Sequence, residues 1–235
     1  MPLLDLNPKY KNLFKHTGRY NIITGGRGSS KSFSTSVFLI LLTFEAGHKI
    51  LFTRLTMVSA NISIIPELVE KIELLGLTQH FKITKNEIVN TQSGSSIMFM
   101  GLRSSNGDNT ARLKSINGIT TLVVDEAEEI SGTDGENMFD KINLSIRTKG
   151  KQNRVILILN PATKTHWIYN RFFEQKGVVE GFNGVKDDTC YIHTTYLDNK
   201  HLSKDFIYEI ELLKKTNSEK YNHIVLGGWL DKSEG

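Results

Sequence analysis

The chain has a single cysteine and no long apolar run, and each shortage excludes a class of protein. With Cys190 alone no intramolecular disulfide can form, which excludes a disulfide-stapled secreted domain and fits a reducing cytosolic setting. The longest uninterrupted apolar run, Val37 to Leu42, is far too short to span a bilayer, and no secretory signal opens the chain. The sequence therefore predicts a protein of the cytoplasm with no membrane partner.

A strong charge excess and internal repeats are also missing. The formal net charge of +4 permits contact with nucleic acid without demonstrating it. Small basic clusters such as Arg147 to Lys151 are more often a solvated face than a phosphate-binding patch. With 235 residues, 39% of them hydrophobic and 23% charged, the chain can bury one substantial core. We therefore expect one catalytic domain over residues 1–235.

What the chain does have is a glycine-rich segment between a strand pattern and an apolar helical pattern. Residues 25–32 read Gly-Gly-Arg-Gly-Ser-Ser-Lys-Ser. A turn that leaves a strand and opens a helix directs backbone N–H groups and the positive end of the helix dipole at one point, as triphosphate binding requires. The residues predicted to bind the nucleotide are Gly25, Gly26, Arg27, Gly28, Ser29, Ser30, Lys31 and Ser32.

One residue of this loop departs from the usual pattern G-x-x-x-x-G-K-[ST], because Ser30 stands where the second glycine is expected. Lys31 would reach the β- and γ-phosphates, and the Ser32 hydroxyl would ligate Mg²⁺. Gly26 and Gly28 would let the loop wrap without side-chain clashes. The alternative is a flexible Gly/Ser turn that happens to contain a lysine, which the flanking strand and helix patterns disfavour.

Two carboxylates follow the buried strand pattern at 121–124. Ligands bind at the carboxyl edge of a parallel sheet, so Asp125 is placed to hold Mg²⁺ through water. Glu126 would orient and deprotonate the attacking water. The alternative is a plain acidic helix start, favourable to the helix dipole. Pairing with the phosphate loop favours the catalytic interpretation.

A second buried strand pattern, 154–159, ends in Asn160-Pro161-Ala162-Thr163. If this strand lies beside the carboxylate strand, Asn160 and Thr163 are candidates for sensing the γ-phosphate and coupling hydrolysis to movement. An Asn-Pro pair also marks an ordinary turn, and the sequence alone leaves both interpretations open.

Strand and helix patterns alternate along the chain, which predicts an α/β domain with a mostly parallel sheet flanked by helices. Two β-like stretches, Phe81 to Asn90 and Ser95 to Leu102, predict a hairpin at one edge of the sheet, and the polar stretch 104–110 predicts a loop. The other expected elements are strands at 20–24, 48–55, 121–124, 154–159 and 189–196, helices at 31–46, 61–75, 136–148 and 165–175, and two helical segments near the C-terminal end.

Taken in order, these segments resemble the ATPase domain of the large terminase subunit, the DNA-packaging motor of tailed bacteriophages and herpes-like viruses. The arginine inside the phosphate loop and the Thr-Tyr-Leu-Asp-Asn run at 195–199 are the most specific parts of the resemblance. The matching segments are the loop 25–32, the carboxylate strand 122–127, the strand ending Asn160-Pro161, residues 194–199 and Leu226-Gly227-Gly228-Trp229.

The resemblance implies an additional-strand P-loop NTPase fold of the ASCE type, with ATP and Mg²⁺ as ligands. It also implies that hydrolysis drives double-stranded DNA into a procapsid. The implied partners are the portal protein, the small terminase subunit and further copies of the chain in a pentameric ring, which assembles in the host-cell cytoplasm on the procapsid portal. Lys31, Ser32, Asp125 and Glu126 keep the roles derived above, Arg27 contacts the nucleotide or relays its state, and Asn160 to Thr163 form the coupling motif.

In such motors an arginine from a neighbouring subunit often stabilises charge in the transition state. Arg112, just ahead of the carboxylate strand, is the first candidate and Arg103 the second, although a surface arginine before a strand needs no special purpose. Large terminases usually carry a C-terminal RNase H-like nuclease as well. No such domain follows within this chain, so we expect no nuclease activity from it.

Two other functions remain open at this stage. A helicase-like, nucleic-acid-stimulated ATPase would need a second RecA-like domain, for which 235 residues leave no room unless a partner chain supplies it. A nucleotide-binding regulatory module would bind ATP tightly with negligible turnover, because of Ser30 or the missing neighbour.

Overall fold

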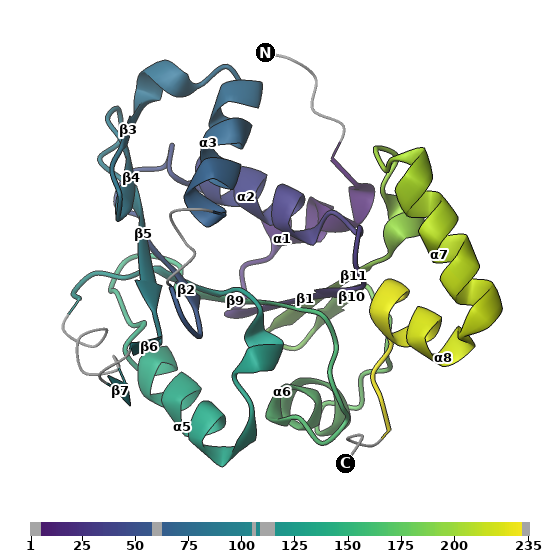
Figure 1. Ribbon diagram of the computed structural model, residues 1–235. Helices are drawn as coiled ribbons and strands as arrows, with labels where there is room; N and C mark the ends of the chain where they lie inside the picture. The colour runs from purple at the N-terminus through teal and green to yellow at the C-terminus, as the bar shows by residue number, and fades with distance from the viewer. Residues whose placement is uncertain (1–5, 58–62, 105–106, 109–115, 232–235) are drawn as a thin grey trace.

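The computed structural model describes residues 6–57, 63–104, 107–108 and 116–231. Within these residues one nine-stranded sheet runs through the molecule, with helices on both faces (Figure 1). In spatial order its strands are β10 (Gly184–Lys186), β11 (Thr189–Thr194), β1 (Tyr20–Gly25), β9 (Arg154–Leu159), β8 (Thr121–Val124), β2 (Lys49–Arg54), β5 (Ser96–Gly101), β4 (Glu87–Asn90) and β3 (Phe81–Ile83).

The strands from β11 to β5 in this order are parallel to their neighbours. Antiparallel strands are added at both edges, β10 at one and β4 with β3 at the other. The prediction of a mostly parallel α/β sheet with a hairpin at its edge is confirmed.

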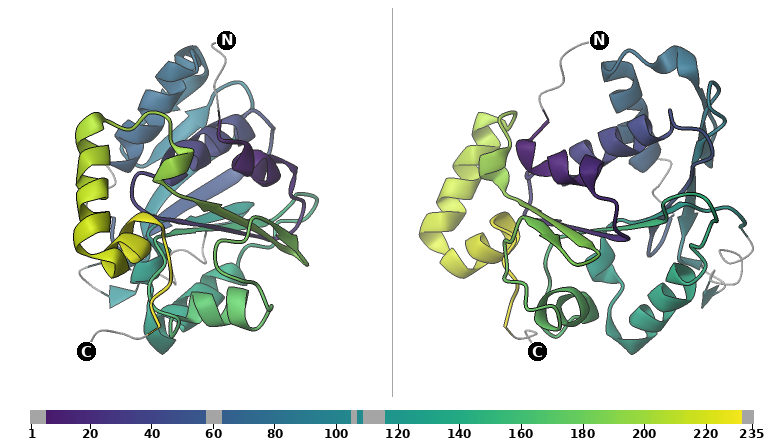
Figure 2. Two further views of the ribbon diagram at one scale, coloured as in Figure 1. Left: turned by 90° about the vertical axis from the view of Figure 1, so that its right-hand side faces the viewer. Right: turned by 180° about the vertical axis from the view of Figure 1, so that it is seen from behind.

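Helices α2 and α3 cover one face of the sheet and α5 and α6 the other, while α7 and α8 lie beside the β11 end (Figures 1 and 2). The helices are α1 (Lys11–Lys15), α2 (Lys31–Leu42), α3 (Ile64–Leu74), α5 (Gly132–Asn143), α6 (Trp167–Tyr169), α7 (Lys204–Thr216) and α8 (Ser218–Lys220). Single turns of 3₁₀ or π type are η1 (Pro8–Tyr10), η2 (Thr78–His80), η3 (Ala127–Glu129), η4 (Asn170–Glu174), η5 (Tyr196–Asp198) and η6 (Tyr221–Val225).

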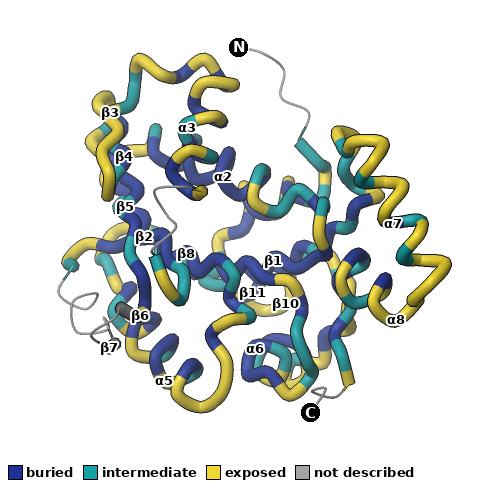
Figure 3. Tube along the Cα trace, in the orientation of Figure 1, coloured by how far each residue is buried: buried dark blue, intermediate teal, exposed yellow. Residues whose placement is uncertain are grey.

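The central strands are buried on both faces, as their uninterrupted apolar patterns require. Figure 3 colours most of these strands as buried. Successive side chains along them belong alternately to two cores. Ile23 and Val123 belong to the core under α2 and α3, whereas Ile22 and Leu122 belong to the core over α5 and α6. Two helical layers therefore hold the sheet rigid, and its carboxyl edge can position side chains.

Strand β9 lies between β1 and β8 and pairs in parallel with both. The strand that precedes the phosphate loop is thus separated from the carboxylate strand by one further strand. This is the additional-strand arrangement implied by the resemblance, and it is confirmed. It brings the ends of all three strands to one edge.

The hairpin prediction was wrong in one respect, because 81–90 is not a single strand. The chain reverses within it, so that β3 and β4 pair with each other. Thr84 closes this turn: its backbone N–H donates to the Glu87 carbonyl at 2.9 Å, and its hydroxyl accepts from the Glu87 N–H at 3.1 Å. Local side-chain bonding of this kind competes with a continuous ladder.

Two helices differ from their predicted bounds. Helix α2 ends at Leu42 rather than at residue 46. Directly after Leu42, the Thr43 hydroxyl donates to the Ile40 carbonyl at 2.6 Å. Helix α5 runs over 132–143 rather than 136–148. Arg19 accounts for its end, since the guanidinium donates to the Asn143 carbonyl at 2.6 Å and to the Ile146 carbonyl at 3.1 Å.

Smaller differences concern short elements. The predicted loop 104–110 includes part of a two-stranded pair, β6 (Arg103–Ser104) with β7 (Gly107–Asp108). The predicted helix 165–175 is one α-turn, α6, continued by the π-turn η4. Strand β10 was missed, because three residues are too few for a periodic pattern. In the described part of the chain, no helix has the length and apolarity that crossing a membrane demands.

Candidate functional site

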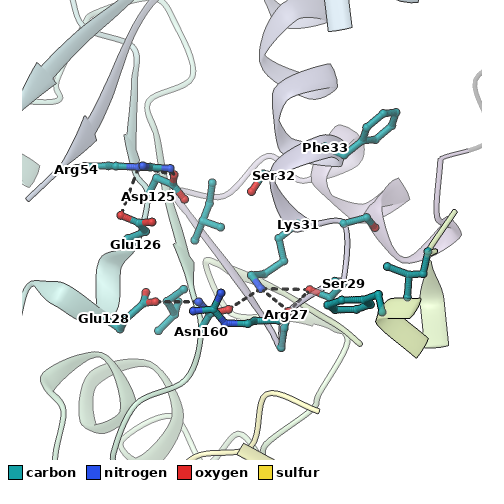
Figure 4. A pocket seen from close by; sticks show the side chains of 17 residues that line it. Arg27, Ser29, Lys31, Ser32, Phe33, Arg54, Asp125, Glu126, Glu128 and Asn160 are labelled. Carbon is teal, nitrogen blue, oxygen red and sulfur yellow. Dashed lines mark hydrogen bonds and ion pairs between the residues drawn. The ribbon is translucent and has the colours of Figure 1, made fainter. Parts of the chain in front are cut away.

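A cavity of about 430 Å³ lies where the loop between β1 and α2 faces the carboxyl ends of β8 and β9. This volume is typical of small-molecule sites. Figure 4 shows the polar side chains that surround it. The lining residues are Gly26, Arg27, Gly28, Ser29, Ser30, Lys31, Ser32, Phe33, Arg54, Asp125, Glu126, Glu128, Ile158, Leu159, Asn160, Leu202 and Phe206.

Lys31 is the centre of the loop side of this cavity. Its ammonium donates to the Gly25 carbonyl at 2.8 Å, the Gly26 carbonyl at 3.0 Å and the Asn160 side-chain oxygen at 2.9 Å. The Ser29 hydroxyl, 3.2 Å away, accepts as well, and itself donates to the Gly26 carbonyl. Burial lowers the pKa of Lys31 to about 8. An anionic ligand would favour the charged ammonium, so the position suits a phosphate.

Ser30 has the backbone of a glycine. Its φ of 61° and ψ of 21° lie in the left-handed region, which explains why the motif usually has glycine there. The loop keeps its path into α2 with serine at this position, at the cost of local strain.

We expect Ser30→Gly to stabilise the protein by about 0.5–1 kcal/mol, because glycine adopts positive φ without the steric penalty of a Cβ. Glycine also raises the conformational entropy of the unfolded chain, which offsets only part of this gain. Denaturant unfolding of the purified variant measures the change. Ser30→Ala is the control, since it keeps the Cβ and should bring no gain. Equal stabilisation by alanine would contradict the strain at this residue.

The carboxylates after β8 enter the cavity from the opposite side. Asp125 is buried, and its backbone N–H donates to the Thr53 carbonyl at 2.9 Å, so β2 fixes its position. Glu126 has a φ of 52°, an unusual conformation for a residue that is not glycine. Burial raises the pKa of Glu126, which makes it a stronger base than a solvated glutamate.

Arg54, the last residue of β2, pairs with both of these carboxylates. Its Nε and Nη2 atoms donate to Asp125 Oδ2 at 2.9 and 2.6 Å, and Nε lies 3.6 Å from Glu126 Oε2. In Figure 4 the guanidinium lies over the two acids. The cavity therefore has Arg27 and Lys31 as cations on the loop side and Arg54 on the strand side.

At the end of β9, Asn160 connects the two sides of the cavity. Its side-chain oxygen accepts from Lys31, and its amide nitrogen donates to Glu128 Oε1 at 3.1 Å. Burial raises the pKa of Glu128. Thr163 is not part of this chain of bonds, because its hydroxyl is 2.7 Å from that of Thr165 and it is absent from the residues that line the cavity.

The C-terminal part of the chain holds the phosphate loop from outside. The Arg27 N–H donates to the Ile224 carbonyl at 2.9 Å, and the Asn199 amide donates to the Gly28 carbonyl at 2.8 Å. Gly26 touches the π-turn η6 so closely that a Cβ there would lie 1.9 Å from the Val225 carbonyl oxygen. The segment 194–199 and the residues before Trp229, which the resemblance singled out, thus lie at the loop.

The oxygen atoms that line the cavity suit Mg²⁺, a hard cation that prefers oxygen ligands. When a substrate's phosphates supply some of these ligands, the protein needs to supply only one or two. Ser32 and Asp125, the two residues predicted to hold the metal, both line the cavity and offer a hydroxyl and a carboxylate. Among the described residues no group of three or more His, Cys, Asp or Glu side chains could hold a metal ion alone. With oxygen ligands from Ser32 and Asp125, the cavity fits a metal that takes its remaining ligands from the phosphates of a nucleotide.

The structure unites most of the predicted site residues. Gly26 to Ser32, Asp125, Glu126 and Asn160 line one cavity, and Gly25 contributes its carbonyl beneath them. Arg103 lies on β6 and is not among the lining residues, and Arg112 lies outside the described part of the chain. Their roles as neighbouring-subunit arginines stay predictions.

Sequence reasoning missed Arg54, Glu128 and the apolar pair Leu202 and Phe206. A signal for Arg54 was present, because it ends a strand at the same sheet edge as the predicted carboxylates. Leu202 and Phe206 could not be found in this way, since they reach the loop from a separate helical segment.

Comparisons with known proteins agree with this geometry. The family model described as "Phage terminase large subunit" matches residues 17–228. The PBSX phage terminase large subunit of Bacillus subtilis (strain 168) is 26% identical over 94% of this chain and 52% of its own length. The large terminase subunit of Bacillus phage SPP1 is 28% identical over 88% of this chain and 48% of its own length.

A solved structure is also similar. The large terminase from a thermophilic bacteriophage superposes with a TM-score of 0.71 at 13% identity, over 97% of this chain and 54% of that one. At this identity the likeness establishes the fold alone. The chain spans about half the length of the curated relatives it matches.

Proposed function

Because this chain belongs to the phage terminase large subunit family, we propose that it is the ATP-hydrolysing motor domain of viral DNA packaging. The observation that carries the proposal is the single cavity in which the loop 25–32, the carboxylates after β8 and Asn160 meet. Two neighbouring structures support ATP as the nucleotide, since the large terminase of the same thermophilic bacteriophage was solved with ATP-gamma-S and with ADP.

The chain's own residues divide the work of phosphoryl transfer between the two sides of the cavity. Lys31 and the loop N–H groups bind the β- and γ-phosphates and hold the terminal phosphorus in place. Glu126 accepts a proton from the attacking water, whose oxygen bonds to the γ-phosphorus while the bond to the bridging oxygen of ADP breaks. Ser32 and Asp125 would hold Mg²⁺, which supplies charge neutralisation on the phosphate oxygens when bound.

Asn160 is the residue best placed to report the state of the nucleotide. It contacts Lys31 on one side and Glu128 on the other, so a phosphate that takes over the Lys31 ammonium would free the Asn160 oxygen. That rearrangement would reach η3 and α5 through Glu128. This supports the predicted coupling role of Asn160, while Thr163 would act only indirectly.

The proposed partners follow from family membership. They are double-stranded DNA, the portal protein, the small terminase subunit and further copies of the chain in a pentameric ring. The proposed place of action is the host-cell cytoplasm, at the procapsid portal. We further propose that residues 1–235 form one ATPase domain, which the continuous nine-stranded sheet with its flanking helices supports.

Lys31→Ala is expected to weaken ATP binding by more than about a hundredfold, because the only ammonium lining the described cavity is lost from the phosphate position. Titration with a fluorescent ATP analogue in the presence of Mg²⁺ measures this, beside steady-state hydrolysis over a range of protein concentrations. Lys15→Ala, an exposed change on α1, is the control.

Three outcomes are informative. Turnover per subunit that rises with protein concentration would support an arginine supplied by a neighbour. Tight binding with negligible turnover at every concentration would favour the regulatory-module alternative. Equal ATP affinity of wild type and Lys31→Ala would contradict the proposed nucleotide site.

A further inference from the structure

We propose that Arg54 is a built-in cation that competes with the divalent metal for Asp125, so that it sets how much metal the site needs before it binds nucleotide. The inference rests on the proposed function of the cavity and concerns the regulation of that site. Nothing in the sequence motifs assigned a role to Arg54.

Geometry places the guanidinium directly on the carboxylate that the metal would need. Both of its short bonds to Asp125, 2.6 and 2.9 Å, end on the same atom, Oδ2. The third contact, 3.6 Å, reaches Glu126. One cation therefore compensates both carboxylates, and a metal held by Asp125 has to share its negative charge with Arg54 or displace the guanidinium.

Burial makes the competition significant. The exposed fraction of the side chain is 16% for Arg54 and 9% for Asp125, so water screens the pair weakly. A buried carboxylate needs a compensating cation, because an unpaired charge destabilises the folded protein far more when it is buried than when it is exposed. Asp125 is therefore compensated either by the guanidinium or by a metal, and each reduces the attraction of the other.

The position of Arg54 distinguishes it from a structural ion pair. It lines the nucleotide cavity together with Lys31, Asp125 and Glu126, and it ends the strand next to β8. By contrast, Arg171 and Asp140 form a pair of the same 2.6 Å length between η4 and α5, and neither lines the cavity. This second pair offers a matched control.

Arg54→Gln tests the inference, because glutamine keeps a polar side chain of similar reach without the charge. We expect the variant to unfold at a lower temperature than wild type in EDTA, and Mg²⁺ alone, without nucleotide, to raise its unfolding temperature more than that of wild type. The Mg²⁺ concentration that half-saturates binding of a fluorescent ATP analogue should fall by about tenfold, since the competing cation is gone.

Arg171→Gln should also lower the unfolding temperature but leave both Mg²⁺ responses as in wild type. Arg54→Lys, which keeps the charge without the planar fork, should give an intermediate Mg²⁺ midpoint and remains informative if the glutamine variant does not fold. A Mg²⁺ midpoint that is unchanged or higher in both Arg54 variants would overturn the inference. Failure of wild type itself to bind Mg²⁺ and the ATP analogue would instead overturn the proposed function.

Discussion

Glu126→Gln is expected to lower ATP turnover by about a thousandfold while leaving ATP binding nearly unchanged. The amide keeps the shape of the side chain but cannot accept a proton from the attacking water. Glu126 is positioned for this role by its left-handed backbone directly after β8 and by Arg54, 3.6 Å from its carboxylate. Phosphate release, followed beside binding of a fluorescent ATP analogue, separates loss of chemistry from loss of affinity.

Glu128→Gln is the matched control, because Glu128 also lines the cavity and its pKa is also raised by burial. Its carboxylate accepts a hydrogen bond from the Asn160 amide, and the side-chain oxygen of glutamine could accept the same hydrogen bond. We expect less than about a tenfold loss of turnover, since a retained hydrogen bond limits the cost. A larger loss at Glu128 than at Glu126 would transfer the role of base to Glu128.

Gly26→Ala is expected to destabilise the protein by about 3 kcal/mol, the upper range for overpacking a tightly fitted site. The added Cβ would lie 1.9 Å from the Val225 carbonyl oxygen and 2.7 Å from that of Ile224. Both are backbone atoms of η6, so relief requires the whole turn to move away from the phosphate loop. Denaturant unfolding measures the stability, and titration with the ATP analogue should show weaker binding.

Gly228→Ala is the control for this variant. It lies in the same C-terminal segment, and the nearest atom to its added Cβ is 3.2 Å away, so a shift of a few tenths of an ångström suffices. If Gly26→Ala were no less stable than Gly228→Ala, the close contact between the loop and η6 would not be needed for folding.

The central strands and the loop were predictable because their patterns are local. Strands buried on both faces are continuous apolar runs, and the residues that end them follow directly in sequence, so Asp125 and Asn160 were found from strand ends alone. Where prediction of bounds failed, a distant partner was responsible. Arg19 ends α5 by bonding carbonyls more than a hundred positions further along the chain.

The same distinction applies to the site. Lys31 and Glu126 could be named from motifs, but the pairing of Arg54 with Asp125 depends on β2 lying next to β8, a strand order that hydrophobic patterning does not encode. The contacts of Asn199 and Phe206 with the loop depend on how the C-terminal helices fold back. Reasoning from strand ends, extended to every strand of the edge, would have reached Arg54.

The strand order also governs when the nucleotide site comes into existence during synthesis. Tyr20 of β1 pairs with Val155 on one side and Thr189 on the other. The first strand to be synthesised can therefore complete its pairing only after β9 and β11, two of the last strands, have been made. Contacts this distant in sequence close slowly. A nascent chain on the ribosome therefore carries β1 unpaired until β9 has emerged, and the phosphate loop gains its remaining neighbours only when β11 and then η6 follow. The cavity, whose lining includes Leu202 and Phe206, is therefore complete only after nearly all of this polypeptide has been translated.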